Sequence, residues 1–402
     1  MKADEKQKIL ITLICALAAI AVSFGIHCFV SGRETDNKIK VGFIYVGDGS
    51  DAYTNNFAKA QLEIENQFAG QVRTITKYNV PEDTVESALI DLVGEECDLI
   101  FTTSYGYGEK AKEYAAMYPD IQFCAATCTN ANEEPYLSNY HTFMGNIYEG
   151  RYISGVVAGM KLKELLEEGR ITKEQAKIGY IAAFPFAEVI SGYTAFFLGV
   201  RSEVPEATMT VKYTYTWGNY RLEKNIAEEL IDEGCVIISQ HSDTSGPAAA
   251  CEETDKSRSV YYVSYNESMR DIAPTTYLTG SKINWSPYMT GAVKAVLSGR
   301  DIESFVKGNV NGNDIGSGFE NDWVRMLEIN EFVTADGTRE KVDELINGFR
   351  QHKLNVFQGD YIGVDPYDPS DMIDLRDGYK ENEHSSAPTF HYILKDVITV
   401  EE

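Results

Sequence analysis

Hydrophobic positions along this chain follow two different spacings. Short runs rich in β-branched and aromatic residues alternate with longer segments in which apolar residues recur every three or four positions. This alternation is typical of parallel sheets whose strands are joined by crossover helices, so the predicted fold class is α/β. The short runs predict strands at 41–46, 72–78, 99–103, 121–125, 178–183, 208–215, 236–240, 260–264 and 275–279.

The same pattern predicts two domains. The strand–helix alternation runs once before about residue 145 and starts again near residue 178, which favours two doubly wound lobes side by side. The clearest helix covers 284–298, where apolar residues form one continuous stripe closed by Ser298 and Gly299. Strand 275–279 and this helix come late and are expected to return to the first lobe. The predicted lobes are 39–145 plus 275–308, and 146–274 plus 309–402 with a C-terminal extension.

The C-terminal extension lacks the strand–helix alternation of the rest of the chain. Residues 359–369 carry glycine, aspartate and proline at turn spacing, and a strand at 390–394 is expected to close the fold. The aspartates lack the spacing of a calcium-binding loop, so no metal site is predicted there.

The N-terminus predicts one membrane segment within residues 1–35. Lys2, Lys6 and Lys8 precede an uncharged run from 9 to 32, which is long enough to span a bilayer as a helix. Basic residues before the run place the remainder of the chain outside the cell. Three alternatives stay open: a retained anchor, a signal peptide cleaved after Ser23, or a lipid-modified Cys28.

Composition narrows the possible partners. The 402 residues include 61 acidic and 36 basic side chains, a net charge of −25, which argues against a nucleic-acid partner and disfavours phosphate-rich ligands. The seven cysteines form no CxxC or Cys/His metal pattern. No cofactor is predicted.

The loops that follow the predicted strands are the candidate binding site. In open parallel sheets, ligands bind beyond the carboxyl ends of the strands. These loops combine aromatic rings with carboxylates and amides and contain few cations, a lining suited to a flat neutral heterocycle and to hydroxyl groups. They lie at 47–56, 104–108, 184–188, 241–244, 265–266 and 280–285.

Catalytic motifs are absent from the sequence. There is no G-x-S-x-G or H-E-x-x-H motif, and His241 has Asp243 nearby without a nucleophile. We therefore predict a protein that is not an enzyme and has no catalytic residues. An acid–base pair drawn from Asp51, Glu188 and Asp243 remains the alternative.

Several ordered motifs resemble one known family. Residues 178–199 read IGYIAAFPFAEVISGYTAFFLG and residues 228–244 read EELIDEGCVIISQHSDT; residues 148–159 and 284–288 fit the same pattern. Together they resemble the basic membrane protein family, a group of substrate-binding proteins similar to purine nucleoside receptors. The resemblance covers about residues 39–310.

This resemblance implies a type I periplasmic-binding fold, with two lobes joined by a hinge, that delivers a nucleoside or related base to the permease of an ABC importer. In the family the first loop reads roughly D-x-S-F-N, with the Phe stacking on the base. Here Asp51 and Asn55 match, Thr54 stands in place of the Phe, and Tyr53 is its candidate replacement. The predicted ligand-binding residues are Asp51, Tyr53, Asn55, Tyr105, Phe184, Tyr193, Asp243, Asn266 and Trp285.

Two other functions compete with a receptor that serves a transporter. The chain could be a ligand sensor that reports occupancy through its membrane segment, although only eight residues precede Ile9. It could also be an enzyme that modifies nucleosides or sugars.

Overall fold

A computed structural model describes residues 38–401 of the chain. The predicted membrane segment, residues 1–35, lies outside these described residues. Between residues 38 and 401, no helix combines the length and the apolar composition needed to cross a membrane.

The first lobe is built on a seven-stranded sheet in the order β11-β12-β5-β4-β3-β1-β2. Parallel pairs join β12, β5, β4, β3 and β1, and β11 is antiparallel to β12 at one edge. The strands are β1 (Ile39–Ile44), β2 (Val72–Lys77), β3 (Leu99–Thr102), β4 (Gln122–Ala126), β5 (Tyr140–Gly145), β11 (Asn309–Asn311) and β12 (Asp314–Ser317).

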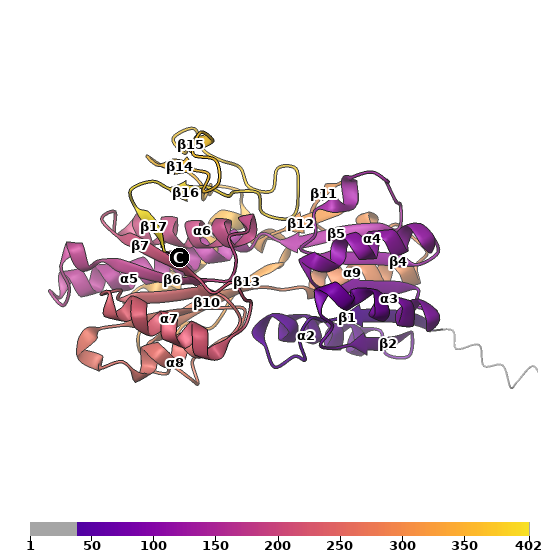
Figure 1. Cartoon of the computed structure of the whole chain (residues 1–402), viewed down its shortest axis with the longest axis horizontal. Helices are drawn as coiled ribbons and strands as arrows, with labels where there is room; N and C mark the ends of the chain where they lie inside the picture. Colours follow the sequence, from indigo (N-terminus) through magenta and orange to yellow (C-terminus); the bar gives the residue numbers. More distant parts are fainter. Residues whose placement is uncertain (1–37, 402) are drawn as a thin grey trace, which may run out of the picture. The chain divides into compact units, whose positions relative to one another are not determined.

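Helices cover both faces of this sheet, as Figure 1 shows. Successive strand residues point to opposite faces: Ile44 and Ile100 pack with α3 (Val85–Gly94) and α4 (Gly108–Met117), whereas Phe43 and Phe101 stack on each other. That second face carries α2 (Ala52–Gln67) and α9 (Ser286–Leu297), which pack together through Phe57 and Trp285.

The second lobe also has a seven-stranded sheet, in the order β13-β10-β9-β8-β6-β7-β17. All neighbouring strands are parallel except β13, which is antiparallel to β10. The strands are β6 (Lys177–Ala182), β7 (Thr208–Tyr213), β8 (Ile237–His241), β9 (Tyr261–Tyr265), β10 (Tyr277–Ile283), β13 (Val324–Met326) and β17 (Ile398–Glu401).

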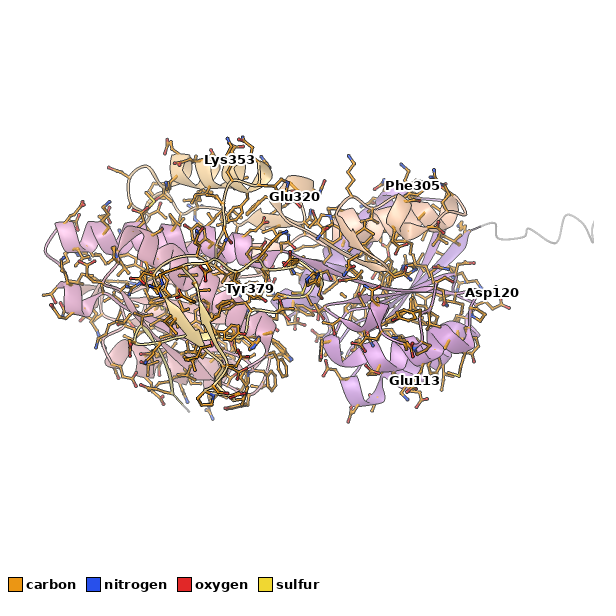
Figure 2. The ribbon with its side chains drawn as sticks, turned by 90° about the horizontal axis from the view of Figure 1, so that it is seen from above. Glu113, Asp120, Phe305, Glu320, Lys353 and Tyr379 are labelled. Carbon is orange, nitrogen blue, oxygen red and sulfur yellow. The ribbon has the colours of Figure 1, made fainter. Side chains whose placement is uncertain are left out.

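Five helices accompany the second sheet. Helices α5 (Ile147–Glu167) and α6 (Ala187–Glu203) pack closely against each other, and α10 (Thr338–Arg350) contacts α5. Helices α7 (Tyr220–Asp232) and α8 (Gly246–Glu253) pack together and share a core with β6, β8 and β9. Side chains fill the interior of both lobes, while Glu113 of α4 and Lys353, just beyond α10, lie on the surface (Figure 2).

The nine predicted strands are present with boundaries shifted by a few residues, but the chain crosses between the lobes differently from the prediction. The strand expected at 275–279 is β10, which pairs with β9 in the second sheet, and only α9 after it returns to the first lobe. Strand β12, expected in the second lobe, pairs with β5 in the first. The chain therefore passes between lobes three times, at 145–147, 283–286 and 317–324.

The C-terminal extension forms a small antiparallel sheet of β14 (Ile362–Val364), β15 (Met372–Asp374) and β16 (Ile393–Leu394), drawn in yellow in Figure 1. The strand expected at 390–394 is the short β16 of this sheet, and β17 is the strand that joins the second sheet, parallel to β7. The buried Glu381 carboxylate attaches the extension to α6, because it accepts hydrogen bonds from Ser191 Oγ at 2.7 Å and Thr389 N at 2.6 Å.

Candidate ligand-binding site

A cavity of about 140 Å³ lies between the two lobes, where the carboxyl ends of both sheets meet. Among residues 38–401, each lobe contributes six lining residues, and no lysine or arginine is among them. This is the position that the strand-end rule predicts for a ligand. The lining comprises Val46, Tyr53, Glu82, Ser104, Tyr105 and Thr127 from the first lobe, and Phe186, Glu188, Trp217, His241, Asp243 and Tyr265 from the second.

Tyr53 is held against the first sheet by the start of α2. Asp51 is the N-cap of this helix and accepts a hydrogen bond from Thr54 N at 2.7 Å, which satisfies a free N–H of the first turn. Within that first turn, the Tyr53 hydroxyl donates to the carbonyl of Thr103 at 2.7 Å. The tyrosine ring is therefore fixed at the cavity wall by a helix cap and a strand end.

Glu82 fixes a second loop of the first lobe. Its carboxylate accepts hydrogen bonds from the Ser104 hydroxyl and from Gly106 N, the latter at 2.9 Å. These bonds hold the turn that presents Tyr105, whose side chain is 60% exposed. Tyr105 approaches Phe186 of the other lobe with ring centroids 6.4 Å apart.

Stacked rings form the second-lobe wall. Phe184 and Phe186, in the loop after β6, stack at 5.2 Å with an interplanar angle of 13°, and Trp217 lies 5.3 Å from Phe184. Phe186 and Trp217 reach the cavity, and Phe184 lies behind them as support. Rings in this arrangement offer flat faces to a planar ligand.

The loop after β8 carries Asp243 and is held in place by hydrogen bonds to α7 and to the loop after β7. Buried Glu223 of α7 accepts hydrogen bonds from Ser242 Oγ at 2.8 Å and Thr244 N at 3.2 Å. The backbone N–H of Asp243 donates to the carbonyl of Trp217 at 2.8 Å, which ties this loop to the loop after β7. The Asp243 carboxyl is thus positioned by two neighbouring elements.

Burial raises the pKa of Asp243 well above its ordinary value, and the negative charges of Asp51, Glu223 and Glu188 raise it further. The raised pKa favours the protonated form, which can donate a hydrogen bond to a ligand as well as accept one.

His241 and Tyr265 close the cavity on the side where Arg151 is buried. The Arg151 guanidinium lies 3.5 Å from the centre of the Tyr265 ring and donates to the Gln240 carbonyl at 3.0 Å. Burial and this positive charge lower the pKa of His241 to about 4, although Glu188 lies 3.6 Å from its Nε2. His241 is therefore neutral near pH 7, so one ring nitrogen can accept a hydrogen bond.

Three of the nine predicted site residues, Tyr53, Tyr105 and Asp243, line the cavity. Asn55 and Asn266 instead connect the lobes: Asn55 Nδ2 donates to Glu267 Oε1 at 2.9 Å, and Asn56 donates to the Asn266 carbonyl at 3.2 Å. Asp51 acts as a helix cap near Asp243.

The remaining predicted rings do not reach the cavity. Phe184 supports Phe186, as described above. Tyr193 is fully buried, with its hydroxyl 3.3 Å from that of Tyr213. Trp285 is also buried and stacks on Phe57 at 4.3 Å. Because both lie on helix faces that pack in a core, their proximity to strand ends does not place them at the ligand.

Sequence reasoning missed several lining residues. The predicted loops contain four further lining residues, Phe186, Glu188, His241 and Tyr265. The sequence does not show which side chains of a loop face the cavity, so it does not identify these four as ligand-binding residues. Trp217 comes two residues after the predicted end of strand 208–215, so the strand-end rule could have selected it. Glu82 follows no strand directly, and only folding brings it to the cavity.

Two seven-stranded α/β lobes, three chain crossings within residues 38–401 and a cavity between strand ends define the two-lobe periplasmic-binding fold. Residues 38–351 match the family described as ABC transporter substrate-binding protein PnrA-like. The chain belongs to this family, which confirms the resemblance seen in its motifs. The family consists of substrate-binding proteins of ABC transporters.

Curated relatives have different ligands in their names. A purine-binding protein of Brucella abortus is 31% identical over 268 residues, covering 66% of this chain and 71% of that protein. A putative ABC transporter glucose-binding protein of Haloferax volcanii is 30% identical over 269 residues, covering 67% of this chain and 63% of that protein.

Solved structures share the fold at low sequence identity. A solute-binding protein of an ABC transporter system from Conexibacter woesei superposes with a TM-score of 0.59 at 16% identity, covering 79% of this chain and 98% of that chain. A solute-binding protein from Aeropyrum pernix also gives 0.59, at 15% identity, covering 79% and 87%. These similarities support the two-lobe architecture alone.

Proposed function

We propose that this protein captures a purine nucleoside or purine base outside the cell and delivers it to the permease of an ABC importer. The N-terminal segment, as a helix or through an attached lipid, would hold it at the membrane. The observation that carries the proposal is the cavity itself, in which flat rings and hydrogen-bonding groups from both lobes surround one small volume.

The lining chemistry fits a neutral aromatic heterocycle. Tyr53, Phe186 and Trp217 offer ring faces for stacking. Asp243, Glu188 and neutral His241 supply hydrogen-bonding groups for ring nitrogens and hydroxyl groups. Because no lysine or arginine among the described residues lines the cavity, a phosphorylated nucleotide would bring negative charge beside carboxyl groups.

The name of the Brucella abortus relative supports a purine ligand, whereas the Haloferax volcanii relative supports a sugar as the second candidate. The aromatic lining favours the purine, because stacking on several rings benefits a planar ligand more than a puckered sugar. The same lining also suits a ligand that presents both a base and a ribose.

Isothermal titration of the full chain tests the proposal. Adenine, hypoxanthine, adenosine, inosine and guanosine would be titrated, with glucose as the competing ligand. We expect saturable heat with at least one purine compound and none with glucose. Heat with glucose alone would overturn the purine assignment, and the absence of heat with every compound would overturn the ligand class.

A matched pair of variants tests whether the ligand binds in the cavity. Trp217→Ala removes a lining ring and should weaken purine binding by about five- to 150-fold, since stacking on an aromatic ring contributes about 1–3 kcal/mol. Tyr220→Ala removes a half-exposed ring outside the cavity and should leave the affinity unchanged. Equal affinities of the two variants would place the ligand elsewhere.

Incubation with each nucleoside, followed by an assay for free base, separates a receptor from an enzyme. A receptor returns the nucleoside intact. Turnover would show that the carboxyl groups of the cavity act as acid and base.

A further inference from the structure

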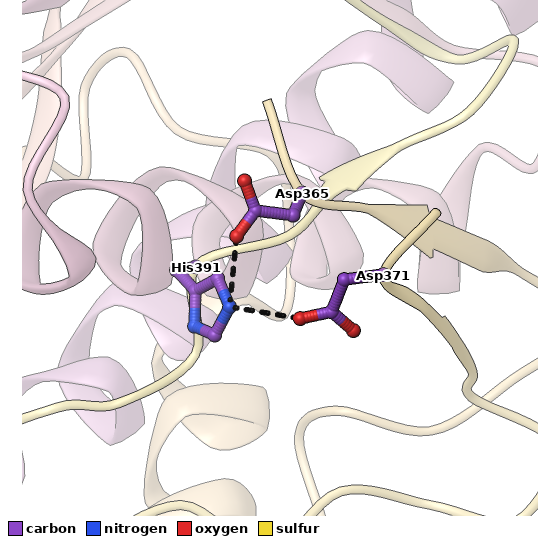
Figure 3. Close-up of side chains that lie close together, drawn as sticks. All are labelled: Asp365, Asp371 and His391. Atoms are coloured by element: carbon purple, nitrogen blue, oxygen red, sulfur yellow. Dashed lines mark ion pairs between the residues drawn. The ribbon is translucent and has the colours of Figure 1, made fainter. Parts of the chain in front are cut away.

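A second chemical site lies in the C-terminal extension, beyond the residues that match the family. Asp365 follows β14, Asp371 precedes β15, and His391 precedes β16. One potential ligand atom from each of these three side chains lies within 4.8 Å of the other two. Figure 3 shows the two carboxylates facing the same edge of the imidazole ring.

The orientation of His391 is set from outside this group. Its Nδ1 lies 2.8 Å from the carbonyl oxygen of Thr389, and a carbonyl oxygen can only accept a hydrogen bond. Nδ1 therefore carries the hydrogen, and in the neutral ring the lone pair of Nε2 faces the two carboxylates. Stacking on Tyr392, with centroids 4.3 Å apart, further fixes the ring. Histidine metal ligands typically have this backbone contact at their other nitrogen.

The distances of His391 from the two carboxylates suit an ion pair and also suit ligands of one metal ion. Nε2 lies 3.2 Å from Asp365 Oδ2 and 3.8 Å from Asp371 Oδ2. Hydrogen bonds between charged groups are shorter, about 2.7–2.9 Å. Two ligands held about 2.0–2.2 Å from one ion lie about 2.8–3.8 Å apart for angles between 90° and 120° at the metal.

Both carboxylates are also oriented by their own contacts. Asp365 Oδ1 accepts hydrogen bonds from the backbone N–H groups of Tyr367 at 2.6 Å and Asp368 at 3.0 Å, which leaves Oδ2 directed at His391. The Tyr392 hydroxyl lies 3.2 Å from Asp371 Oδ1 and donates to it. Contacts outside the group thus orient all three side chains toward one another.

We propose that Asp365, Asp371 and His391 bind one Zn²⁺ or a similar divalent transition-metal ion. One imidazole nitrogen and two carboxylate oxygens are a donor set that suits such ions, whereas Ca²⁺ and Mg²⁺ prefer oxygen ligands alone. Asp371 and His391 are partly exposed, so an ion can enter and water can complete its coordination. The ion links three segments of the extension and would stabilise its small sheet.

Metal titration of the full chain tests this proposal. Zn²⁺ would be added to metal-free protein in competition with a chromophoric chelator, and Co²⁺ binding would be followed by its visible absorption. We expect one equivalent of Zn²⁺ to bind. His391→Ala removes a ligand and Asp365→Asn removes the negative charge of another, so each should weaken binding at least about tenfold. His384→Ala is the matched control, since its imidazole is 89% exposed and lies outside the group.

Far-UV circular dichroism of each variant verifies folding independently of any purine ligand. If no stoichiometric Zn²⁺ binds, or if His391→Ala binds it as tightly as the unmodified chain, the three side chains form an ion pair only and the proposal is wrong. Failure of purine binding would leave this result unaffected.

Discussion

His241 shows how one buried residue can make the stability of the protein depend on pH. Burial and Arg151 lower its pKa to about 4, whereas an unfolded histidine has a pKa of about 6.5. Between these values the unfolded state binds more protons, so the contribution of His241 to stability is present above pH 6.5 and is lost as the pH falls toward 4. The shift corresponds to about 3 kcal/mol.

We therefore predict that His241→Gln removes this part of the pH dependence. The difference in free energy of unfolding between the unmodified chain and the variant should be about 3 kcal/mol smaller at pH 4 than at pH 7, measured by urea unfolding. The raised pKa of Asp243 acts in the opposite direction, but it is present in both proteins. Exposed His384→Gln serves as the control. An equal difference at both pH values would contradict the prediction.

At the scale of elements, two glycines allow α5 and α6 to pack with their backbones in contact. A Cβ atom on Gly155 would lie 1.8 Å from the carbonyl oxygen of Phe196, and one on Gly199 would lie 2.1 Å from that of Tyr152. These distances are too short for any side chain. Helix α5 begins directly after the first crossing between the lobes, so the contact lies in the first helix of the second lobe.

Gly155→Ala should lower the free energy of unfolding by about 3 kcal/mol, because the two helices must separate to admit the methyl group. Gly94→Ala is the matched control: it lies at the end of α3, where a Cβ would meet no other atom within 4 Å, and it should be neutral or stabilise by up to about 1 kcal/mol. Chemical denaturation measures both. A Gly155→Ala protein as stable as the Gly94→Ala protein would show that the helices can shift at little cost.

At the scale of the whole molecule, polar contacts hold the two lobes in the arrangement seen here. Glu267 of the second lobe accepts a hydrogen bond from Asn55 at 2.9 Å and pairs with Lys59 at 3.3 Å, both in α2 of the first lobe. A ligand can close the lobes only through contacts that differ between the open and closed states. Contacts such as these raise the fraction of protein that is ready to bind.

Glu267→Ala should therefore weaken ligand binding about two- to fivefold, the range expected for a partly exposed ion pair and hydrogen bond. Glu328→Ala provides the control, because Glu328 pairs at 3.1 Å with Arg270 of the same lobe and should not alter lobe closure. Titration calorimetry with the purine that binds measures both affinities. Equal losses in the two variants would indicate a general effect on stability.

The sequence by itself determined nine of the sheet strands, the α/β class, the two lobes and the strand ends as the place where a cavity lies. These features follow from local hydrophobic spacing and from the geometry that all parallel sheets share. It also indicated the family, because motifs such as 178–199 keep their order and spacing along the chain.

Only the tertiary structure decided which side chains meet. Sheet pairing placed β10 in the second lobe, packing turned Tyr193 and Trp285 into core residues, and folding brought Glu82 to the cavity. Likewise, Asp365, Asp371 and His391 lie in three separate segments that converge only in the folded extension. Such contacts depend on long-range packing between segments, and the spacing of residues within one segment carries no information about them.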